Sequence, residues 1–165
     1  MDRLILLRHG KADSEATSGQ DFDRALTDRG KRDTVLVARA LAEAGVYPDL
    51  VLVSSAARAV QTWEAAAAVF SRTEVRLIPA LYEIAPADIL DLARSEGQAV
   101  STLMIVGHNP RSRRPVPCGW RVRRGRRATP WRRSRWVFPP AAASVTGFDP
   151  PSFTLYSPKP LGGGS

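Results

Sequence analysis

A chain of 165 residues, 44% of them hydrophobic, is long enough for one domain with its own core and too apolar for a disordered protein. No stretch reaches the roughly 20 consecutive apolar residues that cross a bilayer, and Cys118 alone cannot form an internal disulfide. We therefore expect one domain over residues 1–165, in the cytoplasm and away from membranes. Its formal net charge is +8, which raises the question of an acidic partner such as nucleic acid.

The first predicted elements are a strand and a helix joined by a polar loop. Residues 3–7 (RLILL) form an apolar run, which predicts a buried strand that ends at Arg8-His9-Gly10. Polar residues 11–24 predict a loop. Thr27 is a suitable N-cap, with Asp28 in the first turn, and Gly45 is placed to end the helix that follows.

Further strands and helices alternate along the rest of the chain. The patterns predict strands at 50–53, 75–78, 102–106, 143–148 and 152–156, helices at 57–70 and 86–95, and a flexible tail at 159–165. Strands that alternate with helices favour a three-layer α/β sandwich, in which helices flank a mostly parallel central sheet.

One segment, residues 111–136, carries the positive charge. It holds 11 of the 24 basic residues and no acidic residue, so 13 basic residues remain elsewhere against 16 acidic ones, a net charge of −3. A nucleic-acid-binding arm, with arginines on phosphates and tryptophans stacked on bases, is one interpretation, and a disordered insertion is a second. The third is a reading-frame error, because GC-rich codons read out of frame give mainly Arg, Pro, Gly, Ala, Trp and Cys. We favour the third, since the edges of the segment are abrupt.

Three groups of chemistry-bearing residues follow predicted strands. Arg8-His9, Arg58 and His108 each come just beyond a strand, and ligands of open α/β sheets bind at that edge, so we expect them to converge. A neutral imidazole can attack phosphorus, and arginine offers a planar fork of donors to the phosphoryl oxygens. Arg8 and Arg58 would keep His9 neutral near pH 7, while a protonated His108 would add a donor. No cluster of Cys, His and carboxylates has ligand spacing, so we expect neither metal nor cofactor.

The order and spacing of the motifs point to a known family. The segments LRHG at 7–10, SSAARAVQT at 54–62 and GHNP at 107–110 resemble the histidine phosphatase superfamily. The short chain and DRALTDRG at 23–30 are similar to its SixA-type phosphohistidine phosphatases. The resemblance covers residues 1–110 well and 138–157 loosely.

The resemblance implies a phosphoglycerate-mutase-like fold and a phosphatase that works through a phosphohistidine intermediate. It implies His9 as the phosphorylated nucleophile, with Arg8, Arg58 and His108 around the phosphate, and phosphohistidine in a protein as the substrate. A small phosphate ester is the alternative substrate. A nucleic-acid-binding protein is the alternative of another class, and it rests on residues 111–136 alone. The oligomeric state stays open.

Two further residues are candidates for supporting roles. Arg24 resembles a residue near the pocket mouth in the subgroup, and the other interpretation is a solvated loop arginine. Glu83 falls near an acidic residue of the mutase-like members, so it is a candidate general acid or else a surface glutamate. Imidazole leaves readily once its other nitrogen is protonated, so phosphohistidine needs less acid help than an alkyl phosphate. No asparagine follows RHG within the next few residues, which argues against a sugar-phosphate mutase.

Overall fold

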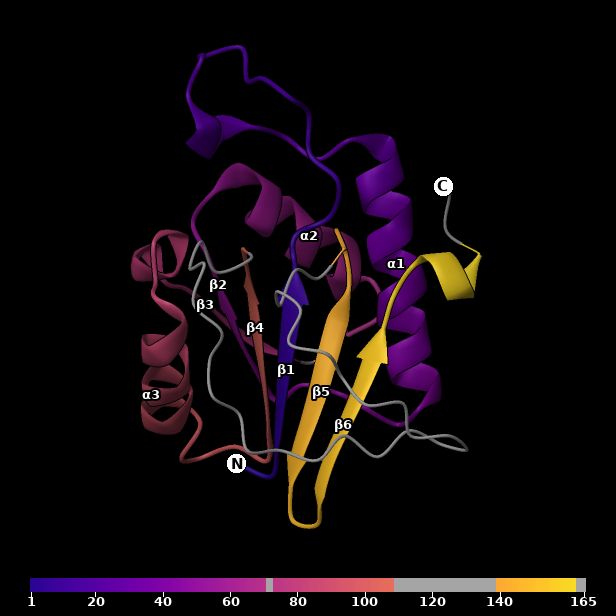
Figure 1. The fold of residues 1–165 in the computed structure, drawn as a ribbon, viewed down its shortest axis with the longest axis vertical. Coiled ribbons are helices and arrows are strands. Elements are labelled where there is room, and N and C mark those ends of the chain that lie inside the picture. The colour runs from indigo at the N-terminus through magenta and orange to yellow at the C-terminus, as the bar shows by residue number, and fades with distance from the viewer. Residues whose placement is uncertain (71–72, 109–138, 163–165) are drawn as a thin grey trace, which may run out of the picture.

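Six strands form one sheet in the order β3-β2-β4-β1-β5-β6, in a computed structural model that describes residues 1–70, 73–108 and 139–162 (Figure 1). The strands are β1 (Arg3–Arg8), β2 (Leu50–Val53), β3 (Glu74–Leu77), β4 (Thr102–Gly107), β5 (Ala143–Phe148) and β6 (Pro151–Tyr156). The helices are α1 (Asp28–Glu43), α2 (Ala57–Ala67) and α3 (Pro86–Glu96), with short 3-10 turns η1 (Asp21–Asp23), η2 (Pro79–Tyr82) and η3 (Lys159–Leu161). The first four strands run parallel, and the β5–β6 hairpin is antiparallel.

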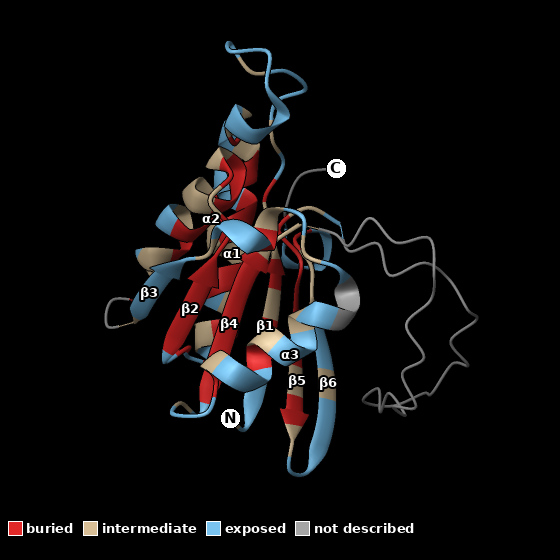
Figure 2. Ribbon diagram, turned by 90° about the vertical axis from the view of Figure 1, so that its left-hand side faces the viewer, coloured by how far each residue is buried: buried red, intermediate tan, exposed pale blue. Residues whose placement is uncertain are grey.

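Helices cover both faces of the sheet, which confirms the predicted three-layer sandwich. Alternate side chains of a strand point to opposite faces, so Ile5 and Leu7 of β1 pack with α1 and α2 on one side. Leu4 belongs to the opposite cluster, where Ala93 of α3 also packs. In Figure 2 the central strand β2 is buried throughout and β4 is buried up to its last residue, while β3 and most of β6 lie exposed at the two edges.

Helix α1 begins and ends where its capping residues predict. The Thr27 hydroxyl accepts a hydrogen bond from the Gly30 amide at 3.0 Å, which satisfies one donor of the first turn. Gly45 has a φ of 71°, and its amide donates to Ala42, while the next amide, of Val46, reaches back to Leu41. This pair of bonds is a Schellman motif, which satisfies the last carbonyls of the helix.

Helix α2 ends at Ala67, three residues before the predicted end. The amides of Val69 and Phe70 bond carbonyls three residues back, so the chain tightens at this point. The turn brings the Phe70 ring into a stacked contact with Trp63, at 6.4 Å between ring centroids. The early helix end thus accompanies a tertiary contact between two rings, which helical periodicity does not contain.

Two glycines bring the loop after β1 against the start of α1. A β-carbon at Gly10 would lie 2.7 Å from the carbonyl oxygen of Gly30, and one at Gly30 would overlap the carbonyl oxygen of Lys11. Neither backbone has space for a side chain at this crossing. This close approach of the two backbones fixes the position of His9, which directly precedes Gly10.

Two predicted segments lie wholly or partly outside the described residues. Residues 111–136 lie within 109–138, outside the described residues, as do residues 163–165 of the predicted tail. Regular structure reaches Leu161 through η3. No helix in the described ranges is both long and apolar enough to cross a membrane.

Candidate active site

The predicted residues meet at the C-terminal edge of the parallel strands. Arg8 ends β1 opposite Gly107 of β4, so His9 and His108 follow from neighbouring strands. The amide of His9 donates to the Gly107 carbonyl at 2.9 Å, and the two imidazole rings lie 5.1 Å apart between centroids. A cavity of about 560 Å³ opens there, lined by Arg8, His9, Asp21, Arg24, Arg58, Leu81, Tyr82, Glu83, Ile84, Ile89 and His108.

Arg58 reaches this edge from the first turn of α2. Its side chain is 7% exposed, because the helix packs against the sheet on this side. The Thr62 hydroxyl, one turn later, donates to the Arg58 carbonyl at 2.6 Å and accepts from the Gly10 amide at 3.0 Å. One buried threonine thus ties the arginine's helix to the loop of His9.

The His9 ring is oriented by the backbone. Its Nδ1 lies 2.8 Å from the Gly10 carbonyl oxygen, which can only accept, so Nδ1 carries the hydrogen and Nε2 keeps its lone pair. Burial lowers the pKa of His9 to about 4, and the charges of Arg8 and Arg58 add to this effect, while the bond to Gly10 opposes it. His9 is therefore neutral at pH 7, with a nitrogen able to attack.

His108 is also neutral at pH 7. Burial, followed by the charge of Arg58, lowers its pKa to about 3. Its Nε2 lies 3.0 Å from the Ser54 hydroxyl, and the Tyr82 ring meets it edge-on at 5.4 Å. This differs from the protonated donor that the sequence suggested, because the depth of burial beside Arg58 could not be read from the sequence.

Arg24 and Glu83 line the same cavity at its outer part. Arg24 is held there by the Asp13 carbonyl, to which its Nε donates at 2.6 Å, and by the Asp21 carboxylate. Glu83 follows η2 directly and is exposed. The structure thus brings all six predicted residues to one cavity, although it assigns no chemical step to any of them.

Sequence reasoning missed two residues, Asp21 and Tyr82. The Asp21 carboxylate accepts hydrogen bonds from Arg24 at 2.7 Å, from Arg58 at 2.8 Å and from the Tyr82 hydroxyl at 2.9 Å. The bonds from Arg24 and Tyr82 hold the pKa of Asp21 far below its usual range. Their only sequence signal is position, since Asp21 is three residues before Arg24 and Tyr82 directly precedes Glu83.

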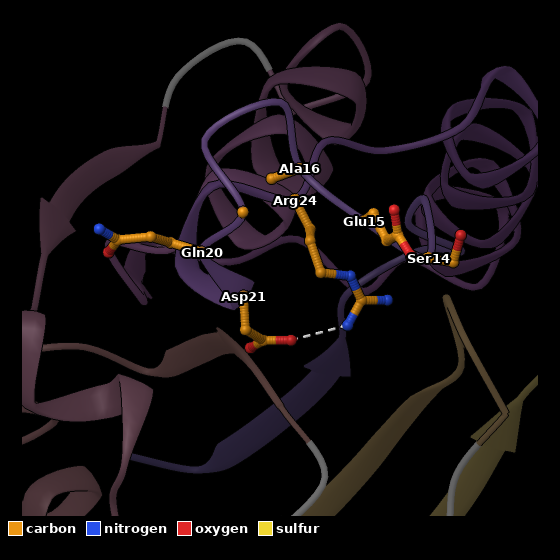
Figure 3. A pocket seen from close by; sticks show the side chains of 7 residues that line it. Ser14, Glu15, Ala16, Gln20, Asp21 and Arg24 are labelled. Carbon is orange, nitrogen blue, oxygen red and sulfur yellow. Dashed lines mark hydrogen bonds and ion pairs between the residues drawn. The ribbon is translucent and has the colours of Figure 1, made fainter.

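A second cavity, of about 320 Å³, lies within the loop that carries Asp21 (Figure 3). Asp21 and Arg24 line both cavities, and Ser14, Glu15 and Gln20 line only the second. Among the residues that the structure describes, no group of three or more His, Cys, Asp or Glu is arranged to hold a metal ion.

Known proteins are similar to this chain in sequence. The family model for the histidine phosphatase superfamily (branch 1) matches residues 4–122. An uncharacterized chloroplastic protein of Arabidopsis thaliana is 34% identical over 117 residues, which are 65% of this chain and 54% of that protein. This chain therefore spans about half the length of that relative.

Solved structures of phosphatases have the same fold. One assigned as the phosphohistidine phosphatase SixA of Agrobacterium tumefaciens is 26% identical, with a TM-score of 0.68 over 88% of this chain and 91% of that one. A protein histidine phosphatase SixA complexed with tungstate is 20% identical, with a TM-score of 0.71 over 96% and 99%. A mycobacterial glucosyl-3-phosphoglycerate phosphatase is 14% identical, with a TM-score of 0.58 over 94% and 97%.

Proposed function

Because this chain belongs to the histidine phosphatase superfamily, we propose that it is a phosphatase that removes phosphoryl groups from phosphohistidine in proteins, through Nε2 of His9. The observation that carries the proposal is the state of that ring. It is neutral, it is oriented by the Gly10 carbonyl, and it lies beside Arg8 and Arg58 in one cavity. A nucleophile of this kind needs no separate base, because its attacking nitrogen carries no proton.

In the first step, Nε2 of His9 attacks phosphorus, and the bond between phosphorus and the substrate's imidazole nitrogen breaks. The leaving imidazole keeps that electron pair, and protonation of its other nitrogen from solvent makes it a good leaving group. Arg8 and Arg58 bind the equatorial oxygens, where the negative charge is spread in the transition state. In the second step, water attacks phospho-His9, which releases inorganic phosphate and restores the neutral ring.

His108 and Arg24 support the proposed reaction in different ways. The negative charge of a bound phosphoryl group raises the pKa of the neighbouring His108, so this ring gains donor capacity when substrate is present. Arg24, at the outer part, steers the anionic substrate inward. Glu83 serves as a proton donor only for leaving groups poorer than imidazole.

A small phosphate ester remains the alternative substrate, because the mycobacterial sugar-phosphate phosphatase has the same fold. We prefer a protein substrate on two grounds. The likeness to the SixA structures is greater, with TM-scores of 0.68 and 0.71 against 0.58 for the sugar-phosphate phosphatase. The cavity is also open enough to admit a side chain, since Arg24 and Asp21 at its edge are 28% and 43% exposed.

The test compares a phosphohistidine-carrying protein with p-nitrophenyl phosphate, both in EDTA. We expect His9→Ala to lower turnover of the phosphohistidine protein by at least about a thousandfold and to abolish labelling from a ³²P substrate. Arg39→Ala, at an exposed position of α1, is the control and should leave both unchanged. Equal activity in His9→Ala would remove the proposed nucleophile. Faster turnover of the small ester would instead favour the alternative substrate.

A further inference from the structure

The carboxylate of Asp21 occupies donors of the kind that bind phosphoryl oxygens. Its Oδ1 accepts from Arg24, and its Oδ2 accepts from both Arg58 and the Tyr82 hydroxyl. The other terminal nitrogen of Arg58, Nη1, donates to the backbone carbonyl of Asp21. One residue therefore engages both terminal nitrogens of Arg58. Carboxylates and phosphoryl groups present paired oxygens to an arginine fork in the same way, so Asp21 uses bonds that a phosphoryl group needs.

Asp21 also places a permanent negative charge in the cavity. Hydrogen bonds from Arg24 and Tyr82 lower the pKa of Asp21, so the group stays ionised throughout the neutral range. Its charge acts on His108 as well, where it favours the protonated ring. A phosphoryl dianion that approaches Arg58 meets this like charge at short range, where repulsion is strongest.

We propose that Asp21 is an intramolecular competitor of the substrate's phosphoryl group, which engages Arg24 and Arg58 in the unliganded site and yields them when that group binds. The inference rests on the proposed function, since it requires a phosphoryl group beside His9. It makes Asp21 a specificity determinant. Inorganic phosphate and small esters make few other contacts, so competition from Asp21 lowers their affinity in full. A protein substrate also contacts the enzyme through its own surface, and these contacts offset the loss.

The structure provides a place for the displaced carboxylate. The second cavity adjoins Asp21 and is lined by residues of the same loop, and His9 is not part of its lining (Figure 3). The contacts of this loop with the rest of the site include the bonds of Asp21 to Arg58 and Tyr82 and an edge-on contact of the Phe22 and Tyr82 rings. A rotation of the Asp21 side chain alone breaks the bonds of its carboxylate to Arg58 and Tyr82, which frees Nη2 of Arg58. The ring contact and the bond from Nη1 of Arg58 to the Asp21 backbone carbonyl stay in place.

Asp21→Asn tests the inference, because it keeps the shape of the side chain and removes its charge. The matched control is Asp23→Asn in the same loop, because this substitution makes the same change in net charge. The Asp23 carboxylate accepts a hydrogen bond from the Ser18 hydroxyl at 2.7 Å. The measurement is the dissociation constant of inorganic phosphate by titration calorimetry, in EDTA near pH 7.5. We expect Asp21→Asn to bind phosphate at least about threefold more tightly than the wild type, and Asp23→Asn to match the wild type. Circular dichroism checks that both variants are folded.

Each other result overturns the inference. Unchanged or weaker binding in Asp21→Asn means that Asp21 holds the arginines in their binding positions. Equal tightening in both variants means that only the net charge matters. If neither the wild type nor Asp21→Asn binds phosphate, the proposed function fails and this inference fails with it. That outcome is distinct from normal wild-type binding with no gain in the variant, which sinks the inference alone.

Discussion

At the scale of single residues, the two histidines can be observed separately, because the chain contains no others. Both rings are half-buried. Loss of hydration, helped by the charges of nearby arginines, lowers the pKa of His9 to about 4 and of His108 to about 3. A proton NMR titration should therefore show neither ring titrating between pH 8 and about 5.5, whereas unfolded chains titrate near 6.5.

The same titration with saturating inorganic phosphate gives the matched comparison. The phosphate charge stabilises a protonated ring, so at least the His108 midpoint should move upward. For activity the sign follows from the neutral nucleophile, since protonation of His9 below about pH 4 removes the lone pair that attacks. A midpoint near 6.5 for either ring in the phosphate-free protein would contradict the lowered pKa values of the two histidines.

Glu83 gives a prediction that depends on the leaving group. Imidazole needs little acid help, so Glu83→Gln should change turnover of a phosphohistidine protein by less than about threefold. The leaving group of an alkyl phosphate is an alkoxide, which must be protonated as it departs. Turnover of an alkyl phosphate by Glu83→Gln should therefore fall at least about tenfold. Glu64→Gln, an exposed position on α2, serves as the control in steady-state assays of both substrates. An equal loss on both substrates would assign Glu83 to binding rather than to proton transfer.

The sequence predicted the positions of His9, Arg58 and His108 because each follows an apolar run that forms a strand, and such ends meet at one edge. It could not predict Asp21 or Tyr82. The bonds of Asp21 join it to residues 37 and 61 positions away, through a loop that has no periodicity. Nor could composition give the depth of burial that makes His108 neutral.

At the scale of elements, the hydrogen bond of the N-cap residue Thr27 can be tested by measuring thermal stability. The Thr27 hydroxyl accepts from the Gly30 amide and donates to the Lys11 carbonyl, so it joins the helix to the loop after β1. Thr27→Ala should destabilise the protein by about 1 kcal/mol, a fall in Tm of roughly 2–4 °C. Thr27→Ser keeps the hydroxyl and should recover most of the loss in a thermal melt. A melt of Thr27→Ala that equals the wild type would show that the cap contributes nothing.

Strand bounds were predictable to within one or two residues because buried strands are short apolar runs between polar ends, as in 50–53. The order of the strands was not predictable. Periodicity identifies a strand but not its neighbours, so the place of β1 between β4 and β5 and the antiparallel β5–β6 pair come only from the structure.

At the scale of the whole molecule, charge distinguishes the interpretations of residues 111–136, which lie outside the described residues. If the segment arises from a reading-frame error, re-reading the gene across codons 108–140 should show two compensating shifts. The natural protein should then lose the arginine excess and focus far below the isoelectric point of 10.7 that the written sequence gives. Isoelectric focusing of protein from the native gene measures this directly, and a band near 10.7 would establish the arginines as real.

If the arginines are real, a gel-shift assay distinguishes a nucleic-acid-binding arm from a disordered insertion. An arginine arm should bind nucleic acid most strongly at about 50 mM salt. Its affinity should fall as the salt concentration rises, because counterion release drives such binding. Deletion of residues 111–136 should abolish the shift. No shift at low salt would leave a segment without a nucleic-acid role.

The position of β1 also matters while the protein is being synthesised. Its neighbours are β4, which the ribosome completes at Gly107, and β5, which begins only at Ala143. Until β5 emerges, the nascent chain displays one side of β1 as an open edge, and open apolar edges recruit other chains. Translation that stops between these points would release a polypeptide with every predicted catalytic side chain and an unprotected strand. We expect such truncated products to aggregate rather than to act as small phosphatases.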